Sequence, residues 1–377
     1  MDNHRRVDTL VEQYYLGSIS RRTFVRRALA LGVPAALIPG LVVEFLSSPV
    51  RAQTSGAGEL VVCSWGGKYT AAQKAAYFDP FEKDTGTRVR VVGIPDLAKI
   101  QAMVKTGNIE WDLIDAEGQW VINLGRAGML ETLDPSAVDT KELVPGTWSQ
   151  WGVGSVAYGY QLAWSTQVYP KGHEPHTWAD FFDTQRFPGR RGAYKQPLPM
   201  LEFALLADGV PKDKLYPLDV QRAFNYLKAK KNVVNVWSPT PSQLPTLLRG
   251  KEVDMISGPA GTQVNLLKKD GVPVDFTWNQ GGWLQSFWVT PKGSKNAAAA
   301  MKLQNYCARA DNCAKFVELY PGLGVPSRKA YGMMPKGVAE SLPTSPQNAA
   351  VEFAISAEWW AQNVEAVTKQ WLEFIGS

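Results

Sequence analysis

The stretch Glu59-Leu60-Val61-Val62-Cys63-Ser64-Trp65-Gly66-Gly67 decides the fold class. It is an apolar run of strand length that ends in two glycines, and a helical pattern follows it as far as Gly86. The next segments predict a strand over Val89–Val92, a helix over Leu97–Lys105 and a strand over Trp111–Ala116. Strands that alternate with helices at this spacing predict parallel β–α–β units, with helices on both faces of a sheet.

The ends of the first and third predicted strands are the place to look for a ligand site. Trp65-Gly66-Gly67 follows the first strand, and Asp115-Ala116-Glu117 ends the third. In open α/β sheets the ligand crevice lies beyond the carboxyl ends of the strands. We therefore expect these two loops to lie side by side.

A second block of elements begins after Gly159–Trp164. Its predicted strands are Gly192–Gln196, Val233–Trp237, Val253–Ser257 and Val274–Trp278, and its predicted helices are about Pro199–Ala207, Leu218–Lys231, Ser242–Arg249 and Gln263–Lys269. Trp283–Thr290 is apolar and leads back to the first block, and helices over Ala297–Leu319 and Gln347–Phe374 finish the chain.

Two α/β blocks with more than one connecting segment predict two lobes joined by a hinge that a ligand can close. We assign residues 57–158 plus 283–320 to lobe 1. Residues 159–282 plus 321–377 then form lobe 2. The expected ligand site is a cleft between the lobes.

Residues 1–52 resemble an export signal. Ser20-Arg21-Arg22-Thr23-Phe24-Val25-Arg26 is similar to the twin-arginine motif, Ala28–Val43 is uncharged, and Val50-Arg51-Ala52 approximates a cleavage site. A membrane-spanning helix and ordinary Sec secretion are the alternatives, but the apolar run falls short of the roughly 20 residues that a span needs. Gln53 follows the proposed cut where a lipid anchor requires Cys. We expect a periplasmic protein whose signal peptide is cleaved.

Composition excludes one large class of partners. The chain has a formal net charge of +5, but residues 1–52 hold seven Arg and no Lys against four acids, so the remainder is nearly neutral. No basic surface for nucleic acid is therefore expected. All fourteen Trp follow residue 52, and we expect most of them in the core and a few at a site.

The cysteines and histidines give weaker signals. Cys63 lies in an apolar strand, and Cys307 and Cys313 flank a break between two helices, where an oxidising compartment would allow a local disulfide. His173 and His176 share one loop without a third ligand, and a solvated pair is the better interpretation. We expect no metal and no cofactor.

Several short segments together resemble a known family, the periplasmic solute-binding proteins of ABC importers, of the spermidine/putrescine type. They are Leu60–Ser64 with Trp65 and Tyr69, Phe81–Gly86, Trp111–Ile114, Gly128–Leu130, Thr177–Asp180, Phe187–Gly189 and Gly281-Gly282. The resemblance covers nearly all of the chain after residue 52. It implies the type II periplasmic binding protein fold, an α/β fold with hinged lobes and a ligand cleft between them.

The resemblance also implies site residues, since aromatic rings and carboxylates hold the amine ligands of this family. By position, Trp65 and Tyr69 are cleft aromatics, and Glu117 and Gln119 are polar contacts at a strand end. A helix N-terminal or solvated acid is the alternative for Glu117. Four further candidates lie in lobe 2 and the crossover strand: Gln196, Ser257, Trp283 and Gln285.

This sequence departs from the polyamine binders in its anionic anchors. The crossover strand has Leu284 and Ser286 where the family places Trp and Asp, and Gln196-Pro197-Leu198-Pro199 replaces expected acids. The segment Ser257–Gly261 offers either backbone N–H groups to a carboxylate or a plain turn. The expected ligand is a small, polyamine-like amine, and an amino acid, a betaine or another small organic solute is the alternative.

Other functions fit less well. The sequence has no phosphate-binding loop, nucleophile elbow or dinucleotide fingerprint, so we expect no enzyme. Ferric-ion binding uses a tyrosine cluster, which Tyr320 and Tyr331 do not form in sequence. The expected partners are a small organic solute and the membrane permease of an ABC transporter, and the protein is expected to be a monomer.

Overall fold

The computed structural model describes residues 26–27, 29–30 and 58–376. Apart from those four early positions, the predicted export segment 1–52 lies outside the described residues, and so does its cleavage site. Over the described part of the chain, no helix combines the length and the apolar character that crossing a bilayer requires.

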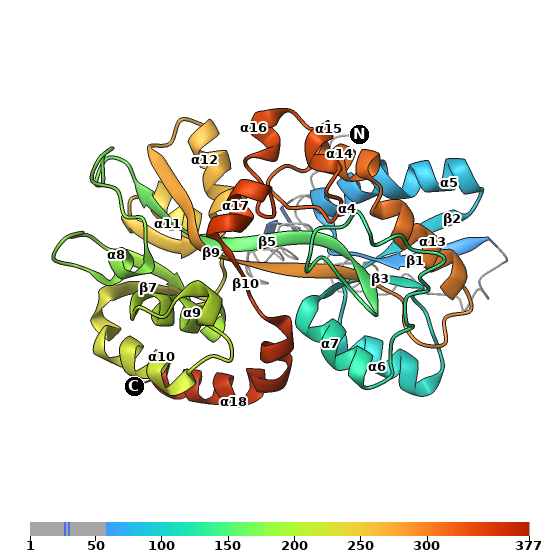
Figure 1. Ribbon diagram of the computed structural model, residues 1–377, viewed down its shortest axis with the longest axis horizontal. Helices are drawn as coiled ribbons and strands as arrows, with labels where there is room; N and C mark the ends of the chain where they lie inside the picture. Colours follow the sequence, from blue (N-terminus) through green and yellow to red (C-terminus); the bar gives the residue numbers. More distant parts are fainter. Residues whose placement is uncertain (1–25, 28, 31–57, 377) are drawn as a thin grey trace.

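One mixed β-sheet runs through the whole molecule (Figure 1). Its strands lie in the order β2-β1-β3-β9-β5-β8-β6-β7, with β4 beside β5 and β10 beside β9. They are β1 (Glu59–Cys63), β2 (Arg88–Val92), β3 (Leu113–Glu117), β4 (Trp148–Ser149), β5 (Gly152–Ser165), β6 (Arg191–Tyr194), β7 (Val234–Ser238), β8 (Met255–Gly258), β9 (Val274–Val289) and β10 (Phe353–Ala354). Parallel pairs join β1 to β2 and β3, and β6 to β7 and β8, which confirms the predicted parallel units in each half.

Lobe 1 has a core on each face of β1. Leu60 and Val62 point to one face, and Val61 and Cys63 point to the other, because side chains alternate along a strand. Helices cover both faces, as Figure 1 shows for α5 and α6. The helices of this lobe are α4 (Gly67–Gln73), the π-helical turn η2 (Lys74–Phe78), α5 (Asp79–Thr85), α6 (Leu97–Thr106), α7 (Gly118–Arg126), α13 (Ala297–Cys307) and α14 (Ala310–Leu319).

Lobe 2 has a core rich in aromatic rings. Trp178 stacks on Phe203 with 3.5 Å between ring centroids, and Trp360 and Trp371 are buried in the same cluster. Its helices before β9 are α8 (Trp178–Phe182), α9 (Pro197–Ala207), η3 (Lys212–Lys214), α10 (Val220–Ala229), η4 (Lys231–Val233), α11 (Gln243–Arg249), η5 (Ala260–Val264) and α12 (Asn265–Lys269). Most of the Trp side chains are therefore used in packing, as expected.

Two long antiparallel strands, β5 and β9, run through both lobes (Figure 1). Residues 152–160 of β5 pair with 282–289 of β9 in lobe 1, where β9 also pairs with β3. Residues 162–165 of β5 pair with 274–277 of β9 in lobe 2, where β5 also pairs with β8. Each lobe thus takes one inner strand from one of these segments and an adjacent strand from the other.

These long strands differ from the sequence-based expectation. The pattern predicted a strand over Val274–Trp278 and a separate apolar segment over Trp283–Thr290 within β9, and no strand at β5. Three glycines inside β5, at positions 152, 154 and 159, weaken its strand pattern. They are needed because a side chain at each would collide with a neighbour, for example with the carbonyl oxygen of Trp288 at Gly152.

A third segment crosses between the lobes beside β5 and β9, and a buried glutamate just before β10 links it to these two strands. Glu352 directly precedes β10, which pairs with β9 at Gly282. Its Oε1 accepts a hydrogen bond from Nε2 of Gln161 on β5 at 2.9 Å, and Oε1 of Gln161 accepts from the N–H of Gly261 at 3.1 Å. Burial raises the pKa of Glu352 to about 8. The segments that cross between the lobes are therefore hydrogen-bonded to one another.

The end of the chain divides between the lobes differently from our expectation. We placed residues 321–377 in lobe 2, but the apolar side chains from 323 to 342 pack into a core of lobe 1: Leu323, Val325, Ala330, Met334 and Leu342. This packing favours lobe 1 for this part of the chain. Residues 353–374 do pack in lobe 2. We propose that lobe 1 extends to about residue 345.

The predicted helix over Gln347–Phe374 is interrupted where the chain changes lobes. Two short helices, α15 (Ala330–Met333) and α16 (Lys336–Ala339), precede it, and the segment itself is divided among α17 (Pro346–Val351), β10 and α18 (Ala357–Gly376). Arg126 of α7 pairs with Glu358 of α18, so the last helix also contacts lobe 1.

The cysteines are buried free thiols, so the possible disulfide between Cys307 and Cys313 is absent. Sγ of Cys313 lies 3.3 Å from the carbonyl oxygen of Cys307 and donates to it. The break between α13 and α14, at Ala308-Arg309, is where the sequence predicted it.

A buried carboxyl group in lobe 2 predicts pH-dependent stability. Glu202 is fully buried, and its Oε1 accepts from Tyr216 and Trp360, each at 2.6 Å, while Oε2 has no partner. Burial raises the pKa of Glu202 to about 7. A carboxyl group with a raised pKa stabilises the fold fully below its ordinary pKa, and that contribution is lost as the pH rises through about 7.

We therefore expect wild-type stability to fall between pH 5 and pH 9, with about 2–3 kcal/mol of the fall due to Glu202. Glu202→Gln keeps the acceptor but cannot ionise, so its decline should be smaller. Guanidinium unfolding at pH 5, 7 and 9 measures this, with exposed Glu373→Gln as control. A wild-type stability that stays level across this range would contradict the prediction.

A second prediction concerns the close packing of α7 on β9. A Cβ at Gly118 would lie 2.8 Å from the carbonyl oxygen of Gln285 and 3.2 Å from Cβ of Ala357. Gly118→Ala should therefore lower the free energy of unfolding by about 1–3 kcal/mol. Gly332→Ala is the matched control, because nothing lies within 4 Å of its Cβ position. Equal free energies of unfolding for the two variants would contradict this prediction, because they would show that α7 can shift away from β9 to accommodate the added methyl group without loss of stability.

Candidate functional site

The carboxyl ends of β1 and β3 meet in lobe 1, as the sequence predicted. Val62 and Cys63 pair with Leu113 and Ile114, so the loops that follow the two strands are neighbours. The rings of Trp65 and Trp120, which follow these strands, have centroids 6.0 Å apart and are both partly exposed. The two loops thus present an indole pair beside the last residue of β3.

Asp115 lies beneath these loops and is completely buried. Its Oδ2 accepts hydrogen bonds from the Tyr69 hydroxyl at 2.7 Å, Gln73 Nε2 at 2.9 Å and the Ser155 hydroxyl at 2.9 Å, and Trp65 also donates to the carboxylate. Its Oδ1 has no partner. Burial raises the pKa of Asp115 to about 6, although the hydrogen bonds act in the opposite direction.

Glu117 is the last residue of β3 and is only partly buried. The hydroxyl of Tyr158 on β5 donates to its Oε2. Burial raises the pKa of Glu117, the Tyr158 hydrogen bond lowers it, and the charge of Asp115 raises it. Burial raises the pKa of Tyr194, and the charge of Glu117 raises it further; Tyr194 ends β6 in lobe 2 and stacks on Tyr160 with 6.0 Å between centroids. Glu117 therefore stands where aromatic side chains of both lobes meet.

Strand register decides which crossover residues share a face with Glu117. Ser286 is directly opposite Glu117, and Leu284 is opposite Tyr158, so these four side chains point to one face of the sheet. Trp283 and Gln285 alternate with them and point to the other face. Both are less than a tenth exposed, and Gln285 Nε2 donates to the Ser286 carbonyl oxygen at 2.7 Å. The structure thus separates Trp283 and Gln285 from Glu117.

The other sequence-predicted site residues have different surroundings. Tyr69 packs edge-on against Phe316 and Tyr320 and uses its hydroxyl on Asp115. Gln119 is partly buried and its Oε1 has no partner, which leaves an acceptor near Glu117 in the first turn of α7.

In lobe 2, Gln196 is exposed at the start of α9 and makes no capping bond there. Ser257 is 1% exposed and donates to the sulfur of Met200 at 3.5 Å, so it does not face a solute in this conformation. The backbone N–H of Gly261 is already bonded to Gln161.

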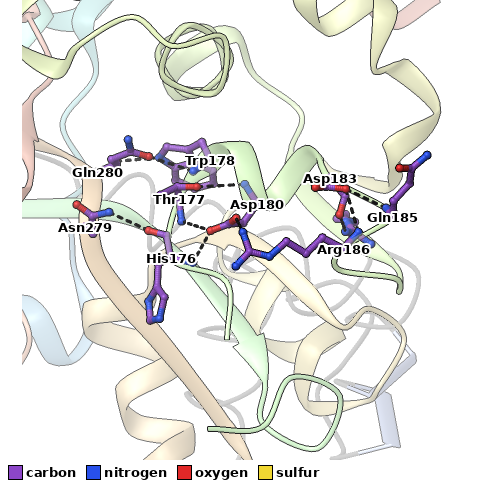
Figure 2. Close-up of polar contacts among 10 residues, drawn as sticks. His176, Thr177, Trp178, Asp180, Asp183, Gln185, Arg186, Asn279 and Gln280 are labelled. Carbon is purple, nitrogen blue, oxygen red and sulfur yellow. Dashed lines mark hydrogen bonds and ion pairs between the residues drawn. The ribbon is translucent and has the colours of Figure 1, made fainter. Parts of the chain in front are cut away.

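The histidine loop forms a separate pocket on lobe 2, with a volume of about 250 Å³, lined by Gly172, His173, Glu174, His176, Arg186 and Phe187. Both imidazoles are on exposed residues, and in Figure 2 the imidazole of His176 points away from the labelled polar contacts. No group of three His, Cys, Asp or Glu side chains suited to a metal ion occurs in the described ranges.

The same loop holds the bend of β9 between its two halves (Figure 2). Trp178 donates its backbone N–H to Gln280 Oε1 at 3.1 Å and its indole N–H to the Gln280 carbonyl oxygen at 2.8 Å. Asn279 Nδ2 donates to the carbonyl oxygen of His176 at 3.0 Å. Gln280 has φ of 59°, a left-handed conformation that is uncommon for a residue with a side chain. We assign this loop a structural role.

Several residues around Glu117 were absent from the predicted site: Asp115, Trp120, Tyr158, Tyr160 and Tyr194. Two signals were available in the sequence. Asp115 is an acid inside an otherwise apolar strand, and Tyr158 and Tyr160 are two residues apart, which places them on one face of any strand. Tyr194 required the tertiary arrangement.

Comparison with known proteins gives consistent matches. Residues 76–344 match the family described as bacterial extracellular solute-binding protein. A gamma-aminobutyric acid-binding protein of Pseudomonas aeruginosa is 33% identical over 319 residues, which are 82% of this chain and 89% of that protein. The structure of the Atu4243-GABA receptor is 34% identical with a TM-score of 0.77, covering 84% of this chain and 97% of that one. AgtB of A. tumefaciens R10, solved with agropinic acid, is 32% identical with a TM-score of 0.68, covering 85% and 100%.

These relatives are two-lobed solute-binding receptors, so the predicted fold class and the absence of an enzymatic function are confirmed. The spermidine/putrescine type is not confirmed, because the relatives named above bind gamma-aminobutyric acid or agropinic acid. The match over 76–344 covers well over half of the sequence. This chain belongs to the bacterial extracellular solute-binding proteins.

Proposed function

We propose that this protein is the solute-binding component of an ABC importer for an amino-acid-type solute that carries an ammonium group, with gamma-aminobutyric acid as the leading candidate. The proposal depends on Glu117, a partly buried carboxylate beside tyrosines of both lobes. An ammonium group that binds there forms charge-assisted hydrogen bonds in a region of low dielectric. The tyrosine and Trp65 rings supply faces for the ligand's methylene chain and its cation.

A single anionic anchor favours an amino acid over a polyamine. The strand ends of lobe 2, Tyr194-Lys195-Gln196 and Ser257-Gly258, carry no acid. A second ammonium group would lose water there without gaining an ionic partner, which is costly. A ligand carboxylate would instead meet amide, hydroxyl and backbone donors. Two relatives with about one-third identity, both named for gamma-aminobutyric acid, support this ligand class.

The same proposal includes the place of action. The twin-arginine-like segment before residue 52 is proposed to export the protein, and the signal peptide is proposed to be removed. Outside the cytoplasm the two lobes would close on the solute about β5 and β9 and present it to a membrane permease.

A thermal-shift screen tests the ligand class directly. Gamma-aminobutyric acid at 100 times its dissociation constant should stabilise the folded protein by about 2.7 kcal/mol, since a ligand of the native state stabilises by mass action. Putrescine, glycine betaine and a sugar serve as comparisons. The fluorescence of Trp65 and Trp120 should change in parallel. Stabilisation by putrescine alone would favour the polyamine alternative.

Substitution of the central carboxylate gives the sharper prediction. Glu117→Gln should weaken binding of gamma-aminobutyric acid by about 10- to 100-fold, because it removes a charged hydrogen-bond acceptor of the ammonium group. Isothermal titration calorimetry at pH 8 measures the change. Glu373→Gln removes an exposed acid from α18 and should bind as the wild type does. An unchanged affinity of Glu117→Gln would remove Glu117 from the site.

A further inference from the structure

Asp115 and Glu117 form a pair of carboxylates on one face of β3. They are two residues apart along the strand, which places their Cα atoms roughly 7 Å apart. Their partners in the register, Trp288 and Ser286, lie on the same face of β9. Glu117 is partly exposed, whereas Asp115 is sealed behind it. A charge that binds at Glu117 is therefore also close to Asp115.

Among the described residues, no cation is one of the groups that shift the pKa of Asp115 most. The interactions that shift its pKa most are burial and hydrogen bonds from the uncharged Tyr69, Gln73, Ser155 and Trp65. Its Oδ1 is buried and unpartnered, so the anion is incompletely solvated. A carboxylate in this condition takes up a proton more readily than an exposed one.

Over the part of the chain that the structure describes, no basic side chain is among the groups whose pKa the charge of Asp115 shifts. These groups come from β1, α4, η2, β3, β5 and α13, and they are Cys63, Tyr69, Tyr77, Glu117, Tyr158 and Cys307. The thiols and phenols are neutral when protonated, and burial raises the pKa of each. Glu117 adds only a second negative charge.

We propose that Asp115 and Glu117 form a proton-linked ammonium site, in which an ammonium group that binds at Glu117 displaces a proton from the pair into solution. This inference rests on the proposed function. Asp115 does not touch the solute and acts through Glu117 as a positioning residue. The ammonium charge favours the ionised pair, and the proton that Asp115 held at mildly acidic pH is released. Affinity for an amine then depends on pH even though the amine itself stays charged.

The measurable consequence is a loss of affinity at acid pH. A proton on Asp115 competes with the ligand, and the pKa of this carboxyl is about 6 in the free protein. Gamma-aminobutyric acid should therefore bind about tenfold more weakly at pH 5 than at pH 8. Calorimetry in two buffers of different ionisation enthalpy should detect proton release near pH 6 and none at pH 8.

Two variants separate this linkage from a structural effect. Asp115→Asn keeps an acceptor for Tyr69 and Ser155 but cannot ionise, so its affinity should be level from pH 5 to pH 8, without proton release. Ser155→Ala removes a hydrogen bond that lowers the pKa of Asp115, so the midpoint of the wild-type profile should move to higher pH. Ser165→Ala, at the other end of β5, should leave the midpoint unchanged.

The outcomes also separate this inference from the proposed function. Binding of gamma-aminobutyric acid at pH 8 with the same affinity at pH 5 and no proton release overturns the linkage and leaves the function standing. A pH profile that Asp115→Asn and Ser155→Ala both leave unchanged overturns it as well. No binding at any pH contradicts the proposed function and the linkage together.

Discussion

The antiparallel pairing of β5 with β9 is the constraint on which the rest of the structure depends. Both strands continue through the two lobes, so the register that aligns them also fixes how the sheet of one lobe meets the sheet of the other. It places Tyr158 opposite Leu284 and next to the pair of Glu117 and Ser286. The hydrogen bond between Tyr158 and Glu117 then ties the end of β3 to the crossover. The geometry around the candidate site is thus set by backbone pairing more than by its loops.

The charge balance around that site follows from the same packing. Asp115 and Glu117 receive hydrogen bonds from hydroxyl, amide and indole groups and none from a basic side chain in the contacts described above. Neutral donors orient a carboxylate without neutralising its charge, so a positive charge that binds nearby stabilises the ionised pair. A solute with an ammonium group supplies this positive charge, and an anionic or neutral solute does not. This is the physical basis for preferring an amino-acid-type ligand.

The sequence was sufficient for the parts of the fold that depend on local pattern. The strands β1, β2, β3 and β6 to β8 were predictable from short strand-like runs between helical segments, and the meeting of Trp65 with the end of β3 followed from parallel topology. β5 was not predictable because its glycines break the strand pattern. Trp283 and Gln285 were chosen from their place in the crossover, but the face of a strand depends on register, which sequence alone did not fix. The packing of residues 323–342 on lobe 1 is likewise a tertiary contact.

The late position of β9 in the chain affects how the protein is made. Residues 274–289 supply an inner strand to lobe 1 and an edge strand to lobe 2, and Leu323 to Leu342 complete a core of lobe 1. Until β9 has been synthesised, the edges of β3 and β5 that pair with it stay open to other chains. Neither lobe can therefore mature on its own during translation. The two-lobed receptor can complete its folding only when nearly the whole chain has left the ribosome.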